Sequence, residues 1–274
     1  MFPKRAFSVI AMTLRRASRH GQIHGAAALT YYLLFSAFPF IILTGLLLSH
    51  LGIEITLTLS TVPVVPGHVS GFFDGYLSQM SEKSWEPYVL FTVVFITFVS
   101  MYRAMICLRE AIDRSFEALP EKKDVNYRLE VFAMAAALLA SIIASLVVLG
   151  ASDSLIGAMF KSVLAPVVWE KLKFVLLTAF IFVTLSLIYY FLPTKRLRYS
   201  QILPGTVVSV AGWLISSLIF GYYAENIASY TTLYGSVATV MVVILWIHLV
   251  AIALIYGAEF NSSLMKIKEQ GDKK

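Results

Sequence analysis

Long uncharged runs constrain this sequence more than any other feature. Six of them are separated by short charged clusters, and they cover 20–53, 87–102, 131–152, 174–194, 199–224 and 226–258. A helix needs about 20 apolar residues to cross the roughly 30 Å hydrocarbon core of a bilayer. Five runs have this length. The run 87–102 reaches it if Arg103 lies near an interface, where its long side chain can carry the charge to the headgroups.

The sequence therefore predicts an all-α polytopic membrane protein. We expect a bundle of six transmembrane helices with short amphipathic surface helices, in one membrane domain over 1–274. The spans are placed near 28–51, 86–107, 130–150, 173–192, 202–222 and 237–259, with a tail over 260–274. Composition agrees, since only 14% of the residues are charged, against roughly 25% in a soluble domain. The connection 151–172 is expected to be a loop broken at Pro166.

The distribution of basic residues predicts the orientation. Only four of the 22 lysines and arginines lie in or beside the connections after the first, third and fifth spans; these are Lys83, Lys161, Lys171 and Lys173. Basic residues close to spans stay on the cytoplasmic side. We therefore expect a multi-pass membrane protein with both termini in the cytoplasm. Six spans preserve the alternation of basic and non-basic connections, whereas an odd number would destroy it.

The first 20 residues allow two interpretations. Phe7, Ile10 and Leu14 recur at helical spacing among polar and basic residues, which predicts a short amphipathic helix on the anionic inner surface. The alternative is a solvated basic tail.

Two spans carry small residues at helical spacing, in the third at every fourth position. The third has Ala133, Ala137, Ser141 and Ser145, and the fifth has Gly205, Ser209, Gly212 and Ser216. Small residues let membrane helices approach closely, so both helices are expected at the centre of the bundle.

Several short motifs occur in a recognisable order. They are Ala26 to Tyr32 with Ser36 and Pro39 in the first span, Tyr189 to Pro193 followed by Pro204 and Gly205, and Tyr234 to Ser236, Leu245, Trp246 and Gly257 to Asn261 in the last part of the chain. Together they resemble the YihY/BrkB family of bacterial inner-membrane proteins over nearly the whole chain. His248 departs from the pattern, since this family is expected to have tyrosine there.

The resemblance implies a link to virulence and serum resistance, an old label as ribonuclease BN, and movement of lipids or lipid-linked envelope material. The residues do not favour nuclease activity. The connection 109–128 has as many acidic as basic residues, and the pair His20 and His24 has no third metal ligand nearby. RNA hydrolysis needs acid–base groups or a metal cluster, together with excess positive charge. We therefore expect no enzyme activity, cofactor, metal or nucleic-acid partner.

Polar and special residues within the spans are the candidates for a pathway or gate: Arg103, Glu259, Asn261, His248, Pro39, Tyr31, Tyr234 and Glu225. Arg103 and Glu259 both come near the cytoplasmic boundary, so an ion pair is one hypothesis, with Asn261 as a further hydrogen-bonding group. The alternative is that each charge reaches the headgroups separately. For His248, a neutral imidazole bonded to another helix is favoured over proton transfer.

Two classes of function remain. The first is a transporter or flippase for a lipid or other amphiphilic envelope component. The second is a non-transporting scaffold of the cell envelope. The partners expected are membrane lipids, a lipid or amphiphile substrate, and a second copy of the chain or another envelope protein.

Overall fold

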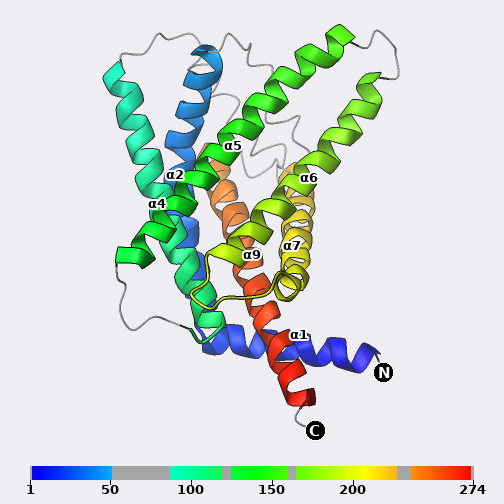
Figure 1. Ribbon diagram of the computed structural model, residues 1–274. Helices are drawn as coiled ribbons and strands as arrows, with labels where there is room; N and C mark the ends of the chain where they lie inside the picture. Colours follow the sequence, from blue (N-terminus) through cyan, green and yellow to red (C-terminus); the bar gives the residue numbers. More distant parts are fainter. Residues whose placement is uncertain (1, 51–86, 119–124, 160–164, 227–235, 273–274) are drawn as a thin grey trace.

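The computed structural model describes residues 2–50, 87–118, 125–159, 165–226 and 236–272 (Figure 1). These residues form helices and short connections, with no strand among them. The helices are α1 (Phe2–Arg19), α2 (Gln22–His50), α4 (Pro87–Ser115), α5 (Val125–Met159), α6 (Ala165–Phe191), α7 (Tyr199–Asn226) and α9 (Ser236–Asp272). The all-α prediction is confirmed.

Five helices of the described part are long and apolar enough to cross a membrane, within α4, α5, α6, α7 and α9. The first expected span, 28–51, corresponds to α2, and its crossing stays a prediction. Each helix is longer than the span placed on it, because hydropathy marks only the hydrocarbon-embedded part. The expectation of a loop over 151–172 is wrong, because α5 continues to Met159 and α6 begins at Ala165. Pro166 lies in the first helical turn, where proline displaces no hydrogen bond.

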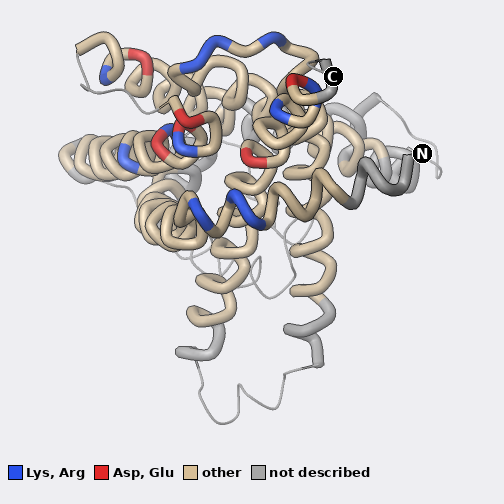
Figure 2. Tube along the Cα trace, turned by 90° about the horizontal axis from the view of Figure 1, so that it is seen from below, with Lys and Arg blue, Asp and Glu red and all other residues tan. Residues whose placement is uncertain are grey.

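The N-terminal helix α1 lies across one end of the bundle (Figure 1). This end, at which α1 lies and at which α4 and α6 finish, is called the basic end below. Gly21, with φ at +62°, makes the corner between α1 and α2, a conformation that costs glycine little. Viewed from below, Figure 2 shows lysine, arginine, aspartate and glutamate gathered at the basic end.

The centre of the bundle is α9, which packs against α1, α2, α4 and α7. Helix α5 packs against α4 and α6, and α6 packs also against α7. Figure 1 shows α5 and α6 inclined away from α2 and α4 toward the end opposite to α1. The expectation of a central third span is therefore wrong. Ala133, Ala137 and Ala140 of α5 are exposed, while Val131, Ala135 and Leu139 form its buried face.

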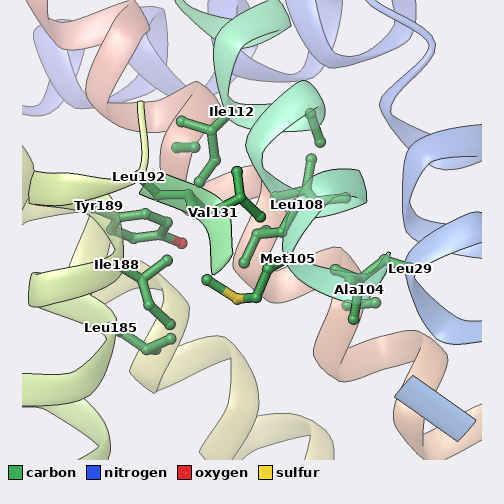
Figure 3. Packing of buried hydrophobic residues seen from close by; sticks show 14 of the residues in the cluster. Leu29, Ala104, Met105, Leu108, Ile112, Val131, Leu185, Ile188, Tyr189 and Leu192 are labelled. Carbon is green, nitrogen blue, oxygen red and sulfur yellow. The ribbon is translucent and has the colours of Figure 1, made fainter. Parts of the chain in front are cut away.

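The main hydrophobic core lies in the half of the bundle nearest the basic end. It joins α2, α4, α5, α6, α7 and α9, and among its members are Leu29, Leu108, Val131, Leu192, Ile202 and Ile255. Figure 3 shows side chains of α4 and α6 meeting in this core around Met105 and Ile188. A second, smaller cluster, around Phe220, Val243 and Ile247, joins α2, α7 and α9 toward the opposite end. Among the described residues, α5 and α6 contribute nothing to it.

Candidate functional site

Glu259 of α9 is the centre of a buried polar cluster at the basic end. Its side chain is fully buried. One carboxylate oxygen, Oε1, lies 2.8 Å from Nε of Arg16, and the other, Oε2, lies 3.0 Å from Nδ1 of His20 and 3.2 Å from Nε2 of Gln22. A buried carboxylate is costly unless it is paired and hydrogen-bonded. These three contacts therefore stabilise a buried charge that apolar surroundings alone could not accommodate.

Arg16 joins three helices through one guanidinium group. Besides Glu259 it donates to the carbonyl oxygen of Ser115 at 2.7 Å and to Oγ of Ser262 at 3.0 Å. Ser115 ends α4, so the cation lies where the helix presents unpaired carbonyl groups and the negative end of its dipole. Arg16 thus fixes α1 to the end of α4 and to α9.

Gln22 extends the cluster to the first turn of α2. Its side-chain nitrogen lies 3.0 Å from the carbonyl oxygen of Ala111, 2.8 Å from Oγ of Ser115 and 3.2 Å from Oε2 of Glu259, and it shares its two protons among these acceptors. The side chain is fully buried. The cluster therefore contacts α1, α2, α4 and α9, which are the helices that meet at the basic end.

The end of α4 has an unusual conformation at Glu117, whose φ is +53°. The amide of Ala118 bonds back to Asp113 and that of Glu117 to Arg114, the pattern of a helix end in which glycine is usual at this position. The Glu117 carboxylate contacts Lys266 and lies 3.1 Å from Arg16. The bond from Lys266 lowers the pKa of Glu117 below its usual value. These contacts offset the strain of a left-handed glutamate.

The ion pair predicted between Arg103 and Glu259 is wrong. Glu259 is paired with Arg16, whereas Arg103 is exposed and lines a pocket between α4 and α5. Separate access to the headgroups does not describe Glu259 either, because the carboxylate is buried. Arg16, His20 and Gln22 were missed as its partners. In the sequence, Arg16 is one of the basic residues that predict the orientation, and nothing there shows that it faces Glu259. The contact exists because the turn at Gly21 brings α1 across α9.

Asn261 lies one turn beyond Gly257 of α9 and binds α7 rather than the charged cluster. Its Oδ1 accepts from the amide of Gly205 at 2.6 Å, and its Nδ2 donates to the carbonyl oxygen of Ile202 at 2.9 Å. Tyr189 of α6 joins the same contact through Ser209 of α7, at 2.6 Å, and through the carbonyl of Leu254. Asn261 is therefore a helix-joining residue of the α7–α9 contact.

His248 lies in α9 facing α2, where its Nδ1 is 3.0 Å from Oγ1 of Thr30. The Thr30 hydroxyl donates its single proton to the carbonyl oxygen of Ala26 at 2.7 Å. Nδ1 of His248 must then donate to Thr30, because a hydroxyl has only one proton to give. This is the geometry expected of an imidazole that hydrogen-bonds a neighbouring helix.

The other predicted residues lie away from the cluster. Pro39 is within α2, which continues through it as one helix. Tyr31 is exposed and its ring packs against Tyr32 and Phe35. Tyr234 and the side chain of Glu225 lie outside the described residues. A role in a pathway stays a prediction for all four.

A set of three or more His, Cys, Asp or Glu side chains that could hold a metal ion does not occur in the described part of the chain. What the cluster around Glu259 can do chemically is hold or release helices. Its partners are Arg16 from α1, His20 from the turn after α1 and Gln22 from α2, so the one carboxylate joins these segments to α9. The fold and this cluster together define a polytopic helical membrane protein with a polar closure at one end.

Comparison with known proteins agrees with this class. The family model described as virulence factor BrkB matches residues 13–274. The chain therefore belongs to the YihY/BrkB family, and the resemblance inferred from the motifs is confirmed.

Two relatives match most of the chain. A ribonuclease-like protein of Bacillus subtilis, YfkH, is 27% identical over 262 residues, covering 90% of this chain and 91% of the relative. A UPF0761 membrane protein of Alteromonas mediterranea is 24% identical over 263 residues, covering 92% and 85%. No solved structure matches the chain.

Proposed function

We propose that this protein moves a lipid or other amphiphile across the membrane, and that the structure is a state closed at the basic end. The observation that carries the proposal is a difference in packing between the two halves of the bundle. Six helices share one core near the basic end, whereas α5 and α6 are absent, as far as they are described, from the smaller cluster toward the opposite end.

The closure at the basic end is both apolar and polar. Leu192, Ile112 and Val131 are fully buried where α6, α4 and α5 meet (Figure 3). Beside them, the cluster around Glu259 joins α1 to the end of α4 and to α9. A pathway through the bundle would be blocked on this side by side chains that only a helix movement could separate.

The opposite half of α6 is uncovered. Residues 172 and 174–184 contain no buried side chain, and Val175 and Val183 are each more than half exposed. Figure 1 shows α6 and α5 leaning away from the other helices in this half. Transporters that alternate between two states seal one end while a lipid- or water-accessible surface opens at the other. The packing difference supports such an end state.

We place the basic end at the cytoplasmic face of a bacterial inner membrane, because all but four lysines and arginines lie on that side of the predicted spans. With Cys107 replaced, a cysteine at Ser154 is expected to react with an impermeant thiol reagent from outside intact cells. Cysteines at Ser18 and Ser200 are expected to react only in opened membranes. Labelling of Ser18 in intact cells would reverse the orientation.

The test of transport is reconstitution of the purified protein into vesicles that contain a fluorescent phospholipid. A membrane-impermeant reductant bleaches only the outer leaflet, so lipid movement is measured as fluorescence lost beyond that leaflet's share. We expect a faster loss than in protein-free vesicles. A rate equal to that of protein-free vesicles, with folded protein present, would contradict transport and favour the scaffold.

A variant separates gating from mere leakage. Glu259→Gln removes the negative charge of the buried cluster, which weakens its bond to Arg16, and is expected to change the rate at equal protein levels. Lys268→Gln is the matched control, since Lys268 is an exposed residue on the same helix. If Glu259→Gln and Lys268→Gln move the lipid at the same rate, the cluster has a structural role alone.

A further inference from the structure

A pocket of about 400 Å³ opens between α4 and α5 near the basic end. It is lined by four residues of α4 and two of the first turn of α5: Tyr102, Arg103, Ile106, Glu110, Tyr127 and Arg128. Its size falls in the range of small-molecule sites, roughly 300–1,000 Å³. The lining combines two aromatic rings with two guanidinium groups and one carboxylate, so positive charge is in excess.

The two arginines of the pocket are available to a ligand. Both are exposed, and within the described part of the chain neither Arg103 nor Arg128 takes part in an ion pair or a side-chain hydrogen bond. Neighbouring arginines behave differently, since Arg109 and Arg196 both contact Glu130, at 2.7 and 3.5 Å. Guanidinium groups bind phosphate oxygens through paired hydrogen bonds. The free pair is therefore suited to a phosphate group.

The wall of the pocket is fixed by buried contacts. The guanidinium of Arg109 lies 4.0 Å from the centre of the Tyr127 ring and donates to the Tyr127 carbonyl oxygen at 3.1 Å. Arg109 is almost completely buried. Because these bonds join α4 to the first turn of α5, the pocket is formed before a ligand enters, and the ordering cost of binding is reduced.

An exposed apolar surface continues from the pocket toward the opposite end of the bundle. Phe132 of α5 contacts Tyr102 at the rim of the pocket, at 6.4 Å between ring centres, and Phe98 at 4.8 Å. Phe132, Val99 and Phe95 are all exposed on this side of the helices. A charged pocket next to an exposed apolar strip matches a molecule with a phosphate head and hydrocarbon chains.

We propose that this pocket binds the phosphate group of an anionic membrane lipid, with the acyl chains along the strip formed by Phe132, Val99 and Phe95. The site names a ligand class for the proposed function. Its role in transport rests on that proposed function. Binding itself is independent of transport and is measured separately.

The test measures binding of phosphatidylglycerol to the full-length protein in detergent. Binding is measured by native mass spectrometry or by the quenching of protein fluorescence by a labelled lipid. We expect Arg103→Gln and Arg128→Gln each to weaken binding roughly tenfold, the usual size of a lost charged hydrogen bond. Arg198→Gln is the matched control, because Arg198 is exposed at the same end but outside the pocket. It is expected to leave binding unchanged.

Three outcomes would overturn the proposal. The first is unchanged binding in the Arg103→Gln/Arg128→Gln double variant. The second is an equal loss in the Arg198→Gln control, which would show a general effect of charge. The third is displacement of the lipid by inorganic phosphate or glycerol phosphate at the same concentration, which would indicate a site for a soluble phosphate. Because both arginines are exposed, the variants are expected to fold, and Arg103→Lys with Arg128→Lys should restore part of the binding.

The two proposals fail in different ways. Binding that depends on the arginines, in a protein that moves no lipid, would contradict transport and leave the phosphate site intact. Transport at the wild-type rate, in a double variant that no longer binds phosphatidylglycerol, would leave transport intact and remove this pocket from it.

Discussion

Helices α7 and α5 carry similar small-residue patterns and use them in opposite ways. In α7, a β-carbon added to Gly205 would lie 2.1 Å from the carbonyl oxygen of Gly257 in α9, so the two backbones are in direct contact. In α5, the corresponding alanines, Ala133 and Ala137, are exposed. Similar small-residue patterns therefore produce a tight helix crossing in one place and an outward surface in the other.

The difference comes from the partner. Helix α9 offers Gly257 and Ala253 opposite the small residues of α7, and Asn261 and Ser209 supply hydrogen bonds across the contact. Lipid chains are as apolar as alanine, so an alanine face gains little by leaving them unless close packing or hydrogen bonds are available. Small residues permit close approach, but complementary groups on the second helix make it favourable.

The largest expected effect concerns the buried carboxylate of α9. Arg16→Gln leaves the buried carboxylate of Glu259 without its main partner, and breaking a buried pair costs about 3–5 kcal/mol. The double variant with Glu259→Gln should lose less than the two single losses summed, as measured by thermal unfolding in detergent. The same cycle with Arg103 in place of Arg16 is the control and should be additive. Additive losses for Arg16 and Glu259 would contradict the pairing.

The next effect concerns the α7–α9 crossing. Gly257→Ala places a β-carbon 1.8 Å from Oγ of Ser209 and 2.6 Å from the carbonyl oxygen of Gly205, so the helices must separate, at a typical cost of about 1–3 kcal/mol. Gly221→Ala, in α7, is the matched control because the added carbon meets no atom within 4 Å. Alanine there should be neutral or stabilising by up to about 1 kcal/mol. Equal melting temperatures for the two variants would disprove the close crossing.

A smaller effect is expected for the small residues of α5. Ala137→Leu adds an apolar side chain to an exposed surface, so the free energy of unfolding should change by no more than about 0.5 kcal/mol. The measurement is again the melting temperature in detergent, beside Gly257→Ala. A loss as large as that of Gly257→Ala would place α5 in a tight contact and break the comparison between the two helices.

The smallest effect is the pH dependence of the contact between Glu117 and Lys266. Because the pKa of Glu117 is lowered in the folded protein, its contribution is fully present above the ordinary glutamate value of about 4.3 and is lost as the pH falls through the lowered pKa. The carboxylate is about half exposed, so the contribution should be below about 1 kcal/mol. The stability difference between wild type and Glu117→Gln should close under acid conditions. A constant difference would exclude this linkage.

Much of the fold could be predicted because the thickness of the bilayer sets the length of each uncharged run. Uncharged runs located the six long helices of the described residues, and the predicted ends differed mainly where a helix continued into the interface, as α4 does to Ser115. The family could also be predicted, because the order of motifs such as Gly257 to Asn261 survives in the sequence.

The candidate site could be predicted only in part. Glu259 and Asn261 stand out as polar residues in an apolar run, but their partners, Arg16 and Gly205, are far away in the chain. Hydropathy gives the depth of each residue and leaves open which way it faces. Arg103 and Glu259 have similar predicted depths, yet one is exposed beside α5 and the other is buried beneath α1.

The sequence by itself determined a membrane-spanning helical chain with its positive charge gathered at one end, since the cost of burying charge in hydrocarbon depends on local composition alone. The tertiary structure alone decided that α9 is central, that Arg16 is the partner of Glu259, and that Arg103 and Arg128 share a pocket. Lipid solvates every apolar helix face nearly equally, so helix neighbours are selected by close packing and hydrogen bonds between residues far apart in the chain.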